Sequence, residues 1–255
     1  MKKIITFLFL AFSFTTVFGQ VWTQKASLPG LTRWYATAFS IGHYGFVGGG
    51  GGIGTDYEDF WRWDQKTNTW SQIATYPGAG SGGMIAFTIN GIGYVGLGIS
   101  SSGAESDLWA YDTTNNTWTQ KASLPSTARY DAFVFVIGTN AYVGSGDPGG
   151  PPYLQDLWKY NSLNNTWTQK ANLPQVMASM GFAIGKNGYA GEGPTSNFYK
   201  YDTTSDTWSL IGTIPYSGGA FGEAVDFVNG NQGFYGTGTC NGCSASSSIR
   251  QFWGL

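Results

Sequence analysis

One phrase recurs along this chain and limits what the chain can fold into. The stretch "YDTTNNTWTQKASLP" at 111–125 returns as "YNSLNNTWTQKANLP" at 160–174, and its second half stands alone as "WTQKASLP" at 22–29. Equivalent tryptophans follow one another at intervals of 48, 48, 49 and 41 residues; they are Trp22, Trp70, Trp118, Trp167 and Trp208. A period near 50 residues with glycine and aromatic signatures is typical of the blades of a β-propeller.

Each interval contains four short segments that are rich in aromatic or β-branched residues and are separated by turn residues. In one unit these are "DAFVFVIG" at 131–138, "AYVGSG" at 141–146, "DLWKYN" at 156–161 and the segment that begins at Trp167. This composition predicts four antiparallel strands per unit, here termed strands a to d. The distance between strands b and c varies most from unit to unit, so the b–c connection is the segment best suited to carry function.

The repeated segments resemble the kelch repeat family. The matching features are a glycine after strand b, an aromatic pair in strand c, and a tryptophan that opens strand d about ten residues later, and they span 21–255. One departure is the double glycine of that family, which occurs only at Gly48-Gly49 and is Gly-x-Gly in the other units. No helical pattern follows these glycines, which argues against a dinucleotide-binding fingerprint. The resemblance implies an all-β, kelch-type propeller.

The two ends of the repeat region complement each other. The region opens with a lone strand d at Val21–Pro29 and ends with strands a, b and c, of which the last is at Arg250–Leu255. Pairing these ends would complete one blade and cover two sheet edges that otherwise favour aggregation. We therefore expect five four-stranded blades, with the last blade closed by the N-terminal strand d and the C-terminal strands a to c.

The first 19 residues have the pattern of a signal peptide. Lys2 and Lys3 precede an apolar run at Ile4–Phe14, and small residues lead to a cleavage site near Gly19. We expect a signal peptide at 1–19, a single propeller domain at 20–255 and export of the chain, whether secreted, periplasmic or on the cell surface. No later segment is apolar enough to span a membrane.

The formal net charge is -2, with 11% charged residues. Binding to nucleic acid or to an anionic membrane would favour a basic face, so neither partner is expected. The chain is expected to be a monomer.

Cys240 and Cys243 are the only cysteines and lie in "CNGC". In an exported protein this spacing favours a short-range disulfide, with free thiols as the alternative. A redox motif would require a helix beside a βαβ unit, and a metal site would require more ligands. No metal or other cofactor is expected.

Candidate ligand-binding residues are those that remain after the repeated packing positions are set aside. Most of them fall in the d–a and b–c loops, which emerge on the same face of an up-and-down blade. Aromatic rings with nearby charged groups suit a sugar or another polar ligand. The alternative is that the aromatics cap the blades and the arginines form local pairs. The candidates are Arg33, Trp34, Tyr35, Tyr57, Arg129, Tyr130, Tyr153 and Glu223.

The chemistry available to this chain is narrow. His43 is the only histidine and lies in a tight turn, so neither a Ser-His-Asp arrangement nor the two-histidine copper site of galactose oxidase, another kelch-fold enzyme, is expected. The sequence predicts an exported binding or scaffolding module for a glycan, a surface component or a protein partner. The alternative is a sugar mutarotase of the N-acetylneuraminate epimerase type, with Arg129, Glu192 and Glu223 as acid–base candidates.

Overall fold

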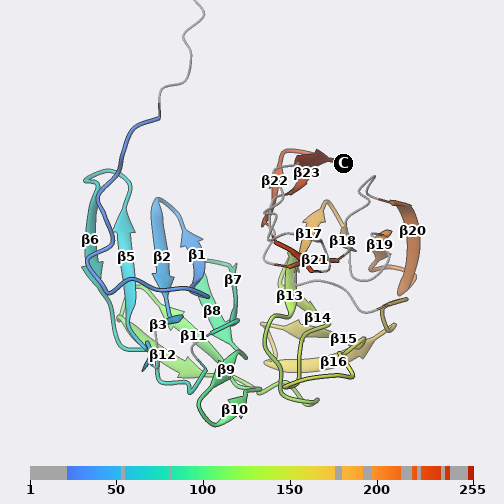
Figure 1. Ribbon diagram of the computed structural model, residues 1–255, viewed down its shortest axis with the longest axis horizontal. Helices are drawn as coiled ribbons and strands as arrows, with labels where there is room; N and C mark the ends of the chain where they lie inside the picture. The colour runs from blue at the N-terminus through green and yellow to red at the C-terminus, as the bar shows by residue number, and fades with distance from the viewer. Residues whose placement is uncertain are drawn as a thin grey trace, which may run out of the picture.

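The computed structural model describes residues 22–52, 55–80, 82–175, 180–191, 197–213, 220–222, 225–236, 239–241 and 252–255. These residues contain strands and turns and no helix. Five antiparallel sheets follow one another along the chain and around an arc, from the blue sheet of β1 and β2 to the red sheet of β22 and β23 (Figure 1). The fold is therefore the predicted β-propeller.

Four of the five sheets have the predicted four strands in the order a, b, c, d. Blade 1 consists of β1 (Thr37–Ile41), β2 (Tyr44–Gly48), β5 (Phe60–Asp64) and β6 (Thr69–Gln72). Blade 2 consists of β7 (Ile85–Ile89), β8 (Ile92–Gly96), β11 (Leu108–Asp112) and β12 (Thr117–Gln120). Blade 3 consists of β13 (Phe133–Ile137), β14 (Asn140–Gly144), β15 (Leu157–Asn161) and β16 (Thr166–Lys170). Blade 4 consists of β17 (Gly181–Ile184), β18 (Asn187–Gly191), β19 (Asn197–Asp202) and β20 (Thr207–Thr213).

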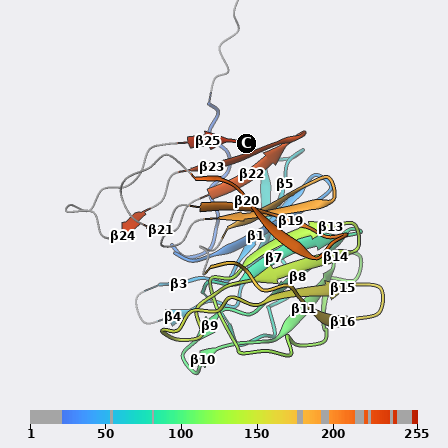
Figure 2. The same cartoon turned by 90° about the vertical axis from the view of Figure 1, so that its right-hand side faces the viewer.

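Among the described residues, the fifth sheet has three strands, and short ribbons extend several of the loops. Blade 5 consists of β22 (Val225–Asn229), β23 (Gln232–Gly236) and β25 (Phe252–Gly254). The ribbons pair β3 (Gly51–Gly52) with β4 (Thr55–Asp56), β9 (Ile99–Ser100) with β10 (Gly103–Ala104), and β21 (Ala220–Gly222) with β24 (Thr239–Asn241). All three ribbons lie toward one side of the molecule, the left of Figure 2.

The hydrophobic cores lie between neighbouring blades. In each blade an aromatic ring of strand a stacks on one of strand b, as Phe87 does on Tyr94 at 5.0 Å between ring centroids. Tyr94 then meets the edge of Tyr160 of the next blade at 5.8 Å. On the opposite side of blade 2, Gly93 lies so close to Phe39 of blade 1 that a Cβ atom would approach its ring to 2.2 Å. These positions explain why the repeat alternates glycine with aromatic residues.

The tryptophan that marks the repeat joins blades 2, 3 and 4 to the preceding blade, and joins blade 1 to the N-terminal segment. The indole Nε1 of Trp118 donates to the carbonyl oxygen of Ala74 at 2.9 Å, and the amide of Ala74 donates to Oδ1 of Asn116 at 2.9 Å. The tryptophans of blades 1, 3 and 4 donate in the same way to Ala26, Ala122 and Ala171. The second half of the recurring phrase therefore serves as an inter-blade clamp.

Closure of the ring differs from the sequence-based expectation. Residues 22–29 form no strand and make no ladder with β25, and the Trp22 side chain is fully exposed. The segment is instead held by blade 1, where Trp70 donates to the Ala26 carbonyl and Ala26 donates to Asn68. It thus takes the place of a preceding strand d on blade 1 without completing the sheet of blade 5. Within the described residues, the expected pairing of Val21–Pro29 with Arg250–Leu255 is not formed.

Two further expectations concern residues on which the structure gives little or no information. The signal peptide at 1–19 lies outside the described residues, as does Cys243; Cys240 lies in β24, but its side chain is not described, so the disulfide stays a prediction. Within the described part of the chain, no helix of the length and apolar character of a membrane span is found.

Candidate functional site

The structure brings the d–a and b–c loops together on one face of blades 1 to 3. Single β-bridges connect Trp34 with Gly51, Gly82 with Ile99, and Tyr130 with Asp147. Trp34, Gly82 and Tyr130 lie 48 residues apart along the chain, so the same bridge between a d–a loop and a b–c loop repeats in three successive blades. We call the surface formed by these loops the loop face.

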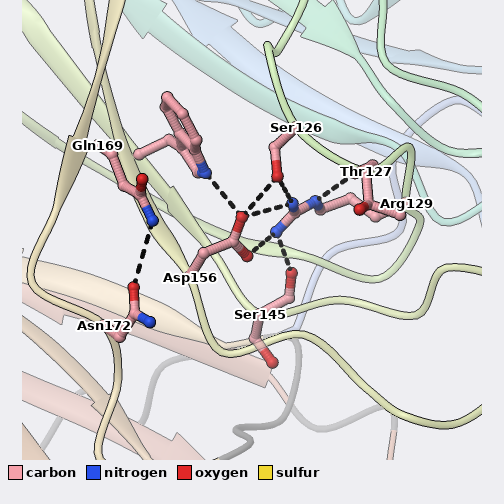
Figure 3. Close-up of polar contacts among 8 residues, drawn as sticks. Ser126, Thr127, Arg129, Ser145, Asp156, Gln169 and Asn172 are labelled. Atoms are coloured by element: carbon pink, nitrogen blue, oxygen red, sulfur yellow. Dashed lines mark hydrogen bonds and ion pairs between the residues drawn. The ribbon is translucent and has the colours of Figure 1, made fainter.

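Arg129 is enclosed within this face (Figure 3). Its side chain is completely buried, and its Nη1 and Nη2 atoms bind the two carboxylate oxygens of Asp156 at 2.6 and 2.8 Å. Nη1 also donates to the Ser145 carbonyl at 2.9 Å, and Nε donates to the Thr127 carbonyl at 3.0 Å. Burial alone would raise the pKa of Asp156, but the hydrogen bonds from Arg129 and Ser126 outweigh it and hold the pKa at about 2.

Arg33 has the same environment in blade 1. Its side chain is 5% exposed and binds both oxygens of Asp59, at 2.9 and 2.8 Å. It donates to the carbonyls of Gly49 and Leu31 and lies over the ring of Tyr57 at 5.0 Å. Both arginines were expected to face a ligand, but in the structure each forms an internal ion pair with an aspartate. They also belong to the repeated packing, because each aspartate accepts the indole hydrogen of the tryptophan two residues later.

Blade 2 contains the same aspartate and tryptophan without an arginine. The indole of Trp109 donates to Oδ2 of Asp107 at 2.6 Å. The sequence has Ser81 at the register of the two arginines, a residue outside the described part of the chain. Oδ1 of Asp107 is buried and has no hydrogen-bond partner in the part of the chain that the structure describes. Burial is the main reason why the pKa of Asp107 is raised, and the nearby Glu105 contributes to the shift.

Tyr76 lies beside this carboxylate and replaces the leucines found at its register in blades 1 and 3, Leu28 and Leu124. The side chain is fully buried, and its hydroxyl has no hydrogen-bond partner among the described residues. A Cβ atom on Gly78 would lie 2.5 Å from both the Tyr76 hydroxyl and Oδ2 of Asp107, so the two polar groups converge on one point. Burial, followed by the charges of Asp107 and Glu105, raises the pKa of Tyr76.

Several of the expected aromatic residues are exposed on the loop face. Trp34, Tyr35 and Tyr153 are 54%, 53% and 50% exposed, which is unusual for three large rings in neighbouring loops. Tyr130 is half-buried, and burial together with Asp147 raises its pKa to about 12. Tyr57 is half-buried beneath the guanidinium of Arg33. The structure therefore places three of the five predicted aromatics where a ligand can reach them.

The glycines of blade 2 connect the aromatic residues of blades 1 and 3. The Cβ position of Gly82 lies 3.6 Å from Cβ of Tyr35, and that of Gly83 lies 3.1 Å from Cβ of Tyr130. Tyr35, with a φ of 55°, adopts the left-handed conformation that Gly83 adopts at the same register. This conformation costs a bulky residue about 1–2 kcal/mol and is frequent at functional sites. The loop face is thus continuous from blade 1 to blade 3, with small residues in its centre.

The charged groups of the loop face in blades 1 to 3 are mainly acidic. Lys25 and Lys121 lie at the start of the d–a segments, and both arginines are in ion pairs; the other charged residues in these loops are carboxylates. They are Asp56, Glu58, Glu105, Asp107, Asp131 and Asp147. Glu223 lies outside the described residues. Among the described residues, no group of three or more histidine, cysteine or acidic side chains is arranged to hold a metal ion.

Asp107 and Tyr76 were not among the sequence-predicted site residues. A signal for them was present, because three units have aspartate before the first residue of strand c while only two have the arginine. Tyr76 is also an aromatic residue where other units have leucine. The importance of the missing arginine follows only from the contacts of Arg33 and Arg129.

Comparison with known proteins supports the fold. No protein-family model matches the chain, and no curated protein matches it. Solved structures do resemble it, and one of them is the structure of YjhT. The two align with a TM-score of 0.78 over 93% of this chain and 85% of that chain, at 15% sequence identity. At this identity the likeness shows a propeller-like fold alone, and it does not confirm the kelch family. Because 429 chains match, the fold by itself indicates no particular activity.

Proposed function

We propose that this protein is an exported binding module that recognises its partner through the loop face of blades 1 to 3. The observation that carries the proposal is the exposure of Trp34, Tyr35 and Tyr153, each at least 50%, on one continuous face. Large exposed aromatics grouped on a surface favour binding to a partner, since they bury much area at little cost in side-chain entropy. The signal sequence predicted at 1–19 would direct the module out of the cytoplasm.

The charge of the loop face narrows the class of partner. The loops that bear the exposed rings also contain carboxylates, and the two arginines that could attract an anion already bind Asp59 and Asp156. An acidic ligand would bring like charges together, whereas a neutral or cationic ligand would not. A neutral glycan, a basic surface component or a basic segment of a protein would each satisfy this condition.

An array of charge-matched ligands tests the proposal. The purified chain 20–255 is applied to neutral, amino-substituted and acidic oligosaccharides of one linkage, and to peptides of equal length with net charges of +3, 0 and -3. We expect neutral or cationic members to be retained, and this retention should weaken with added salt for the cationic ones. Retention of only the acidic members would contradict the proposal.

A sugar mutarotase of the N-acetylneuraminate epimerase type is the second candidate. The likeness to YjhT fits this candidate at the level of the fold. Of its three acid–base candidates, Arg129 is held by Asp156, and Glu192 and Glu223 lie outside the described residues. Magnetisation exchange between the α and β anomers of free sugars, measured by NMR with and without the protein, tests this activity. Exchange at the uncatalysed rate for every sugar would exclude it.

A further inference from the structure

The arginine-bearing blades show which groups surround a guanidinium at this position of the repeat. In blade 3 the guanidinium of Arg129 is held by the Asp156 carboxylate, the Ser145 carbonyl and the Thr127 carbonyl. In blade 1 the guanidinium of Arg33 is held by the corresponding groups of Asp59, Gly49 and Leu31. Two independent copies of the site thus bind the same cation through one carboxylate and two carbonyls.

Blade 2 has the same three groups at the same register. They are the Asp107 carboxylate and the carbonyls of Leu97 and Ala79, each 48 residues after its counterpart in blade 1. Leu97 also repeats the left-handed conformation of its counterparts, with a φ of 57° against 62° for Gly49 and 59° for Ser145. The amide of Leu97 donates to the Asp107 carbonyl at 2.9 Å, as the amide of Ser145 donates to that of Asp156 at 3.3 Å. The backbone around the Asp107 carboxylate and the Leu97 carbonyl therefore matches that of the other two sites.

The polar groups of the blade 2 site have unused hydrogen-bonding capacity. Within the described ranges, Oδ1 of Asp107, which corresponds to the oxygen that Nη1 binds in the other blades, has no partner, and neither has the buried hydroxyl of Tyr76. A buried carboxylate without a cationic partner is costly, so the site favours a ligand that supplies a cation with several N–H donors. A guanidinium meets this need better than an ammonium, because its planar fork can bind a carboxylate and a carbonyl together.

We propose that the blade 2 site, formed by the Asp107 carboxylate and the Leu97 carbonyl, binds the guanidinium of an arginine side chain on a protein partner when the Tyr76 hydroxyl moves aside. This proposal rests on the proposed function and specifies the partner of the same loop face. The exposed rings suit such a partner, since arginine stacks on aromatic faces, as Arg33 does on Tyr57 and Arg62 does on Tyr44 at 4.8 Å. A neutral glycan would leave the Asp107 carboxylate without a countercharge.

Entry of the guanidinium requires a small rearrangement at Gly78, Gly80 and Tyr76. The side chain of Asp107 is partly exposed, and the neighbouring Ala79 is exposed. The Cβ position of Gly80, however, lies 2.3 Å from the Leu97 carbonyl oxygen, and the Tyr76 hydroxyl lies where Nη2 of Arg33 lies relative to Gly30 in blade 1. A loop of small residues can make this adjustment, since glycine has wide conformational freedom.

A set of matched peptides tests the proposal by calorimetry. The probes are acetylated and amidated Gly-Arg-Gly, the same peptide with citrulline, which has the shape of arginine without its charge, and the same peptide with lysine. We expect the arginine peptide to bind the chain 20–255 at least tenfold more tightly than the citrulline peptide and severalfold more tightly than the lysine peptide. Equal affinity for arginine and citrulline would overturn the proposal.

Three variants connect this binding to the blade 2 site. Asp107→Asn should abolish the preference for arginine over citrulline, whereas Tyr76→Leu, which restores the residue of blades 1 and 3, should keep or strengthen it. Tyr76→Leu with Ser81→Arg should lose the binding, because the chain then fills the site with its own arginine. Unchanged binding in the Asp107→Asn variant or in the double variant would place the arginine elsewhere and contradict the proposal. The folded state of each variant is checked by its melting temperature.

The same variants separate this proposal from the broader proposed function. If Trp34→Ala removes retention on the array while Asp107→Asn leaves it intact, the loop face binds ligand but not through a guanidinium at blade 2. If a neutral glycan is retained regardless of Asp107, the guanidinium proposal is likewise wrong, although the binding function stands. Arg129→Ser provides a positive control, because it should open a second site of the same kind and raise the peptide stoichiometry.

Discussion

Blades 1 and 3 bury an arginine against an aspartate, whereas blade 2 buries the aspartate beside a tyrosine. The three carboxylates share one contact: each of Asp59, Asp107 and Asp156 accepts an indole hydrogen at 2.6 or 2.7 Å. The difference lies in the partner of the carboxylate and in its pKa, which is lowered in Asp59 and Asp156 and raised in Asp107. The comparison teaches that one repeat position can either stabilise a blade or, when its arginine is absent, become available to a ligand.

The largest expected effect on stability comes from replacing an internal arginine. Arg129→Ala removes a fully buried side chain and leaves Asp156 without its ion-pair partner. Breaking a buried pair in this way costs about 3–5 kcal/mol in unfolding free energy. Urea denaturation of the variant and the parent measures the difference. A loss of unfolding free energy below about 1 kcal/mol would mean that the ion pair does not stabilise blade 3, and the contrast with blade 2 would be wrong.

The pH dependence of stability should also identify the Arg129–Asp156 pair. Its aspartate has a folded pKa near 2, below the usual 3.8, so its contribution is present above about pH 4 and is lost as the pH falls toward 2. The Arg129→Ala variant should therefore lose less stability than the parent between pH 4 and pH 2. Parallel acid-denaturation curves for the two proteins would contradict this explanation.

A second carboxylate whose pKa is raised by burial gives the opposite pH dependence. Burial raises the pKa of Asp226 in β22 from 3.8 to about 6. Because the folded state holds this proton more tightly than the unfolded state, stability should fall as the pH rises from about 4 through 6. Asp226→Asn should remove this fall and raise the unfolding free energy at pH 7.5 by about 2–3 kcal/mol. Equal stability of variant and parent at pH 7.5 would contradict the assignment.

Converting the blade 2 site into a copy of the blade 1 site should change the unfolding free energy less than the preceding substitutions. Tyr76→Leu with Ser81→Arg introduces the leucine and arginine of the other blades beside Asp107. The new arginine would satisfy the unpartnered Oδ1 atom, and we expect the unfolding free energy to rise by about 1–2 kcal/mol. Thermal unfolding measures the gain, with Ser81→Lys as the control, since lysine lacks the planar fork. A fall in stability would show that blade 2 has no room for the guanidinium.

Much of the fold could be predicted from the sequence because the residues that pack the blades recur at fixed positions in every repeat. The period of the tryptophans, the glycines beside aromatic rings and the four strands per blade all recur several times, so chance resemblance is excluded. Ring closure was not predictable in the same way. The segment at 22–29 carries the sequence of a strand d, yet its clamp to blade 1 through Ala26 does not require a ladder with β25.

The candidate site was predicted only in part. The loop positions of Trp34, Tyr35 and Tyr153 follow from subtracting the repeated residues, and the structure exposes all three. The arginines were misplaced because their aspartate partners lie 26 and 27 residues away, a distance at which sequence alone gives no geometry. Whether an arginine faces solvent or a buried carboxylate depends on tertiary contacts.

The most direct test of the account compares two exposed tryptophans of the same protein. Trp34 is 54% exposed on the loop face, whereas Trp22 is fully exposed in the N-terminal segment. The dissociation constant of the ligand retained most strongly on the array is measured by calorimetry for the parent, Trp34→Ala and Trp22→Ala. We predict that Trp34→Ala weakens binding at least tenfold with a melting temperature within about 2 °C of the parent, and that Trp22→Ala leaves the affinity unchanged. Unchanged affinity in Trp34→Ala, or an equal loss in both variants, would contradict binding through the loop face.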